Sequence, residues 1–114
     1  MTSRKIYDPK LLSLQEISGV ILDRRLALLR ACGAARSTSL KLLQDLEPKE
    51  SGEEIEPIAL AKSNLQYQAW ADRRRAEINI LLARQTVDLI EARKLAMSAF
   101  GKADAIRHLI AQLK

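Results

Sequence analysis

Residues 78–113, INILLARQTVDLIEARKLAMSAFGKADAIRHLIAQL, decide the fold of this chain. Apolar or small residues, with one glutamine among them, recur there at alternating steps of four and three. This heptad ladder comprises Ile78, Leu82, Gln85, Leu89, Ala92, Ala96, Ala99, Ala103, Ile106, Ile110 and Leu113. An average step of 3.5 residues is the period of a helix that winds around another helix. The ladder therefore predicts a coiled coil.

The composition of the 114 residues suits long helices better than a globular core. Aromatic residues make up 4% of the chain, and its four glycines and three prolines allow few turns. Leu, Ile and Ala dominate, as they do in packed helices. The single cysteine, Cys32, excludes an intrachain disulfide. It lies among alanines and is expected to pack as a small side chain in a cytoplasmic protein.

Two helices joined by an acidic turn are expected. The first covers residues 9–46, because Asp8-Pro9 pairs a capping acceptor with a proline suited to the first helical position. Two prolines, a glycine and five glutamates make residues 47–57 a solvated turn. The second helix covers residues 58–113. The prediction is one all-α domain, an antiparallel two-helix coiled-coil hairpin whose second helix is longer than the first.

The pairing of the two helices is predicted from the apolar residues of the first. These are Leu14, Ile17, Ile21, Leu28, Cys32, Ala35, Leu42 and Leu46. A turn centred on Gly52 pairs Leu46 with Ile58 and Leu14 with Ile90. Residues 95–114 then have no partner within the chain, which predicts a docking site for another protein or a second copy. The alternative is that the first ten residues fold back over this stretch.

Two groups of residues are candidates for partner binding. Tyr67, Trp70 and Arg74 lie on one helix face, and Trp and Arg are enriched at binding hot spots. The alternative for Trp70 is packing against the first helix near Ala34. The second group lies in the stretch expected to be uncovered. It comprises Phe100, Ile106, Ile110 and Leu113.

The chain lacks the residue patterns that catalysis and metal binding require. His108 is the only histidine, and no phosphate-binding loop or Ser/His/Asp set is present. We expect no catalytic, cofactor or metal site. The N-terminus has no apolar signal segment, and no apolar run approaches the roughly 20 residues needed to span a bilayer. We therefore expect a soluble protein, or one peripheral to a membrane.

The net charge of +5 lies entirely in the second half of the chain. Residues 1–56 hold nine Lys/Arg and nine Asp/Glu, whereas residues 57–114 hold ten and five. The second half should therefore attract an acidic protein surface or nucleic acid. Arg73-Arg74-Arg75, close to Trp70, is the densest basic cluster. Three consecutive helical residues spread widely around the axis, so a solvated face is favoured and nucleic-acid binding is the rival function.

Two segments of the second helix resemble small coiled-coil proteins of flagellar and type III export systems, the FliJ family. They are QAWADRRRAEIN at residues 68–79 and EARKLAMSAFGKADAI at residues 91–106, and the resemblance covers residues 60–114. It implies a stalk-like protein, cytoplasmic or peripheral at the inner membrane. It also implies binding to a hexameric export ATPase, to the export gate and to chaperones. A homo-oligomeric coiled coil with a purely structural role is a further alternative.

Overall fold

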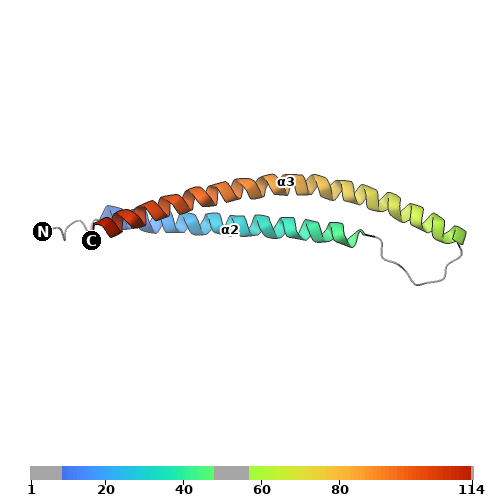
Figure 1. The fold of residues 1–114 in the computed structure, drawn as a ribbon, viewed down its shortest axis with the longest axis horizontal. Coiled ribbons are helices and arrows are strands. Elements are labelled where there is room, and N and C mark those ends of the chain that lie inside the picture. Colours follow the sequence, from blue (N-terminus) through green and yellow to red (C-terminus); the bar gives the residue numbers. More distant parts are fainter. Residues whose placement is uncertain (1–8, 48–56, 114) are drawn as a thin grey trace. The chain divides into compact units, whose positions relative to one another are not determined.

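The computed structural model describes residues 9–47 and 57–113, and these residues form two helices (Figure 1). Helix α2 spans Pro9–Asp45 and helix α3 spans Pro57–Gln112, and no strand occurs in the two described stretches. The prediction of an all-α hairpin with a longer second helix is confirmed. Most of the acidic segment predicted as a turn, residues 48–56, lies outside the described residues.

Local sequence explains where the two helices begin and end. Each starts on a proline, whose fixed φ and missing N–H suit the first helical position. At the end of α2 the amides of Leu46 and Glu47 donate to the carbonyls of Leu43 and Gln44, each at 3.1 Å. These tightened contacts satisfy carbonyls that a helix end otherwise leaves without a partner, and Pro48 follows in the sequence.

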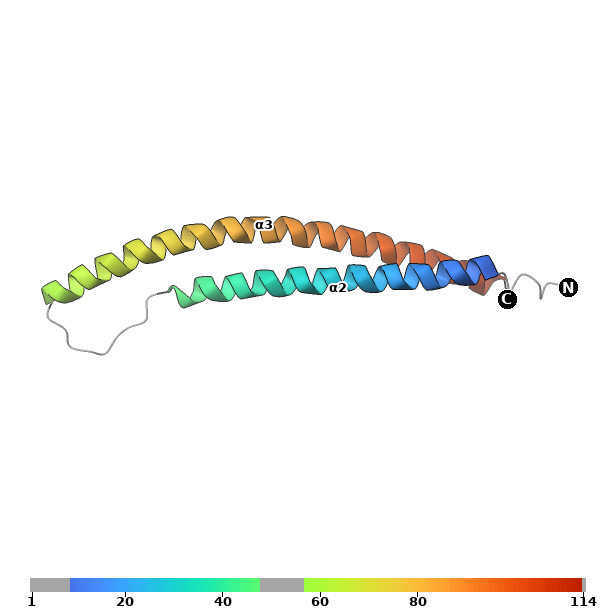
Figure 2. The same ribbon diagram turned by 180° about the vertical axis from the view of Figure 1, so that it is seen from behind.

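The chain divides into two compact units, each containing part of both helices. Unit 1 comprises residues 1–33 and 87–114, and unit 2 comprises residues 34–86. Within each unit a stretch of α2 lies beside a stretch of α3 that runs in the opposite direction (Figure 1, Figure 2). Each unit is therefore an antiparallel helix pair with its own contacts.

The heptad ladder is the line along which α3 is covered in both units. Ile78, Ala92, Ala96 and Ala99 are buried. Every other rung from Leu82 to Leu113 is half-buried. The run of alanines in unit 1 lets the helix backbones approach closely, since an alanine projects only one carbon atom from the backbone. The ladder was therefore assigned correctly as the packing face of α3.

Most of the residues predicted to form the packing face of α2 lie one position away from the residues that do form it, so that prediction was wrong. Of the predicted members, Cys32 and Leu46 are covered, whereas the other six are exposed. The observed α2 seam comprises Leu11, Ser18, Leu22, Arg25, Leu29, Cys32, Arg36, Ser39, Leu43 and Leu46. One residue along a helix rotates a side chain by about 100°.

Two residues of the α2 seam are polar, which explains why apolar periodicity did not identify the seam. Ser18 and Ser39 are both buried. Their hydroxyl groups donate to backbone carbonyls of the preceding turn, Ser18 to Gln15 at 2.9 Å and Ser39 to Ala35 at 3.3 Å. A hydroxyl satisfied within its own helix can be buried at little cost, so these serines take seam positions without a partner from α3.

The predicted register between the helices was also wrong. In unit 2, Arg36 Nε donates to Thr86 Oγ1 at 3.2 Å, and Leu46 packs in a cluster with Ala71 and Ile78 instead of meeting Ile58. The physical reason lies at the start of α3, where heptad positions are small or polar. Sliding the pairing along α3 gains apolar contacts, while each doubling of a connecting loop costs only about 0.6 kcal/mol.

Candidate protein-binding surfaces

Tyr67, Trp70 and Arg74 lie together in unit 2, at the end of α2. They line an open groove of about 350 Å³ whose other walls come from both helices. Those further lining residues are Leu42, Asp45, Leu46 and Ile78. The sequence placed the first three on one helix face, but it did not show that the end of α2 completes a groove around them.

Tyr67 connects the groove to the helix end. Its hydroxyl donates to the carbonyl of Leu46 at 3.2 Å, one of the carbonyls that the end of α2 leaves without a helical partner. The rings of Tyr67 and Trp70 lie 5.8 Å apart, centroid to centroid, at an angle of 43°. This contact orients the indole, yet 49% of Trp70 remains exposed. Trp70 therefore lies beside the end of α2, at Leu42 and Leu46, and not near Ala34 as the alternative predicted.

The arginine run beside Trp70 is partly neutralised by its own helix. Arg74 forms an ion pair with Glu77 at 3.1 Å, and Arg75 forms one with Asp72 at 2.7 Å. Both pairs are exposed, so they add little stability, but they place carboxylates among the cations. A phosphate backbone would have to compete with these carboxylates, which weighs against nucleic acid as the partner of this face.

The C-terminal stretch of α3, expected to lack a partner within the chain, is covered by α2 in unit 1. Ile106, Ile110 and Leu113 are half-buried and belong to the heptad ladder that contacts α2. The prediction that residues 95–114 stand uncovered was therefore wrong, because it depended on the wrong register. Ile106, Ile110 and Leu113 therefore contribute to the packing of α3 against α2.

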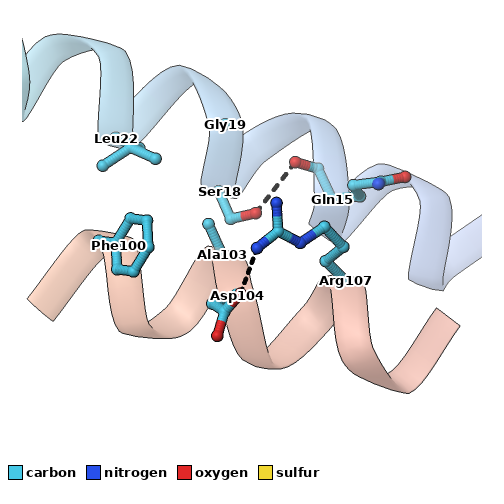
Figure 3. Close-up of a pocket in the computed structure, with 8 residues that line it drawn as sticks. All are labelled: Gln15, Ser18, Gly19, Leu22, Phe100, Ala103, Asp104 and Arg107. Atoms are coloured by element: carbon cyan, nitrogen blue, oxygen red, sulfur yellow. Dashed lines mark hydrogen bonds and ion pairs between the residues drawn. The ribbon is translucent and has the colours of Figure 1, made fainter. Parts of the chain in front are cut away.

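Phe100 is the exception, since it points out of the ladder into an open groove of about 170 Å³ (Figure 3). In the close-up its ring faces Leu22 across the two helices, with Gly19 and Ser18 on the α2 wall. Arg107 and Asp104, which form an ion pair with each other, close the α3 side. The groove is shallow and partly charged, and it leaves more than half of Phe100 exposed.

Large apolar side chains are exposed far more often than buried in the described residues. Within residues 9–47 and 57–113, twenty large apolar or aromatic residues are exposed, whereas Leu46 and Ile78 are the only large ones that are buried. Eight of the exposed residues lie on α2. A helix with apolar residues on several faces normally has several neighbours. The hairpin therefore leaves much of its described apolar surface uncovered.

No group of three or more His, Cys, Asp or Glu side chains that could hold a metal ion occurs in residues 9–47 and 57–113. His108 contacts Asp104 of its own helix, with Nδ1 2.8 Å from the Asp104 carbonyl oxygen. Within the same residues, neither helix is both long and apolar enough to cross a membrane.

Comparison of the chain with protein families, curated proteins and solved structures finds no match.

Proposed function

We propose that this chain is a non-enzymatic adaptor or stalk protein of a flagellar or type III export apparatus. Its partners in this proposal are the export ATPase ring, the export gate or export chaperones. The basis is the resemblance of residues 60–114 to the FliJ family, taken together with the helical hairpin. The observation that carries the proposal is the Trp70 groove, an aromatic and basic recess at a helix end.

The groove has the chemistry of a peptide or helix anchor. Leu42, Leu46 and Ile78 give it an apolar floor, and the half-exposed Trp70 can cover an inserted apolar side chain. Arg74 at its edge suits an acidic residue beside that side chain, in competition with Glu77. The net positive charge of the second half of the chain would steer the protein toward an acidic partner surface.

The direct test is binding of the purified full chain to a purified hexameric export ATPase. Trp70→Ala should weaken binding by about 30-fold, as expected for loss of a hot-spot residue worth about 2 kcal/mol. Leu65→Ala is the matched control, because Leu65 is 69% exposed on the same helix and does not line the groove. Equal effects of the two substitutions, or no binding by the wild-type chain, would refute the proposal.

A second part of the experiment tests the alternative function, nucleic-acid binding. The chain is titrated with duplex DNA and with single-stranded RNA at increasing salt. For a basic helix that neutralises phosphates, the logarithm of the binding constant falls linearly with the logarithm of the salt concentration. We expect no binding to either nucleic acid at physiological ionic strength. Strong binding there would favour nucleic-acid binding, and not the export apparatus, as the function.

A further inference from the structure

Unit 1 carries an exposed face of mixed apolar and charged residues that the fold leaves without a neighbour. We call it the Ile21 face. Its apolar members are Leu14, Ile17, Ile21, Leu28 and Ala31 of α2 and Leu95, Ala105 and Leu109 of α3, and its charged members include Arg24 of α2 and Asp88, Glu91 and Lys102 of α3, all exposed. Four of these residues are the ones the sequence assigned to the packing face of α2. They form a second apolar stripe beside the α2 seam.

The two helices present this face on the same side of unit 1. Every member except Leu14 lies one position before a residue of the α2 seam or the heptad ladder, a rotation of about 100°. In an antiparallel pair that rotation turns both helices toward the same side. The opposite side follows the same rule, since Gly19 and Phe100 each lie one position after a seam or ladder residue and line one groove. In a four-helix bundle each helix contacts two neighbours, on faces about 90° apart. The Ile21 face is placed for such a second contact.

We propose that the Ile21 face binds the Ile21 face of a second copy of this chain, with the two copies antiparallel. Two charged residues of α3 favour a second copy of the chain as the partner. Glu91 and Lys102 flank Leu95 on the face, about 16 Å apart along one helix, and neither forms an ion pair among the described residues. A twofold axis midway between them sets Glu91 of each copy against Lys102 of the other, so the attraction occurs twice. Parallel packing of the copies would place α3 of one copy over α2 of the other and would lose both Glu91–Lys102 pairs.

The same register fits the side chains of α2. The axis that pairs Glu91 with Lys102 places Ile21 of one copy opposite Ala31 of the other, so a large side chain meets a small one. It also places Arg24 opposite Leu28, where the aliphatic stem of the arginine can lie along the leucine. Unit 1 overlaps its copy over residues 19–33 of α2 and 87–106 of α3, a face of roughly 26 by 20 Å and about 1,000 Å² in total. Leu14, Ile17 and Leu109 lie outside this overlap. Interfaces of this size belong to reversible complexes, so the dimer should depend on concentration. This proposal does not rest on the export apparatus.

Charge exchange tests the proposal, with sedimentation equilibrium as the readout and circular dichroism as the check on folding. The wild-type chain should shift from monomer to dimer between micromolar and submillimolar concentrations. Glu91→Lys and Lys102→Glu should each weaken the dimer by about tenfold, and the double exchange should restore it. Lys94→Glu, the same charge change on an exposed residue outside the face, should weaken it less than Lys102→Glu does.

Three results would overturn the proposal. These are a wild-type chain that stays monomeric over the whole range, a double exchange as weak as either single change, and an effect of Lys94→Glu equal to that of Lys102→Glu. Ile21→Glu adds a test of the apolar part of the face and should abolish the dimer. Met97→Glu, an exposed residue on the opposite side of unit 1, should leave it intact.

Discussion

Ile78 and Ile80 offer a direct measure of how much the heptad ladder contributes to stability. They are the same residue type, two positions apart on α3. Ile78 is 2% exposed and packs in a cluster with Leu46 and Ala71, whereas Ile80 is 61% exposed. Replacing each with alanine removes the same atoms from the same helix. The difference between the two variants therefore reports the environment of the side chain.

The expected free-energy changes follow from burial. Alanine lacks three carbon atoms of isoleucine, worth about 2.4 kcal/mol at ~0.8 kcal/mol per fully buried group. Alanine also favours the helix by roughly 0.4 kcal/mol, and the vacated space beside Leu46 adds a cavity cost. Ile78→Ala should thus lower the free energy of unfolding by about 2–3 kcal/mol. Ile80→Ala, with most of its surface already in water, should lower it by about 0.5 kcal/mol.

Urea unfolding followed by circular dichroism at one fixed protein concentration measures both variants. A fixed concentration matters, because any self-association couples stability to protein concentration. Equal losses for Ile78→Ala and Ile80→Ala would contradict the ladder as the packing face of α3. An effect of Ile78→Ala below about 1 kcal/mol would mean that unit 2 gains little from contact between its helices.

The remaining predictions concern glycines, a helix end and the alanine run. Gly19→Ala and Gly33→Ala should each raise the free energy of unfolding by up to about 1 kcal/mol in urea titrations, because a methyl group at either position meets no atom within 4 Å. Tyr67→Phe should cost about 1 kcal/mol in the same titrations through loss of its hydrogen bond to a helix-end carbonyl. Ala96→Leu should cost about 1–3 kcal/mol by overpacking a buried position, whereas Ala111→Leu, exposed on the same helix, should leave the melting temperature nearly unchanged.

The packing face of α3 could be predicted because its ladder has an uninterrupted period and only one polar rung. The face of α2 could not, because apolar residues occupy nearly every side of that helix. Leu14 and Ile17 form as good a stripe as Leu11 and Leu22, and periodicity alone cannot choose between two stripes one residue apart. Burial of Ser18 decided the choice, and a serine in the packing face gives no apolar signal.

The register failed for a related reason. The length of the acidic segment suggested a tight turn, and a tight turn fixes which residues face each other. Side-chain matching between the helices determines the register instead, and contacts such as Arg36 with Thr86 record the outcome. Apolar periodicity cannot reveal a contact between two polar residues 50 positions apart. The ladder residues beyond position 95, expected to be free for docking, were therefore covered by α2, whereas Ile58, expected to meet Leu46, was exposed.

That reversal moves the place where function should be sought. The α2 stripe of Leu14, Ile17, Ile21 and Leu28 attracted attention for the right property, since it is apolar and regularly spaced. It does not meet α3, so its regularity needs another cause. A surface helix under no constraint to pack has no reason to keep a heptad of large side chains in water, where each exposed group favours aggregation. A spacing that suits helix packing on a face without a helix supports the proposal that a helix from outside the hairpin packs there, and the antiparallel match of Glu91 with Lys102 supports a second copy of the chain.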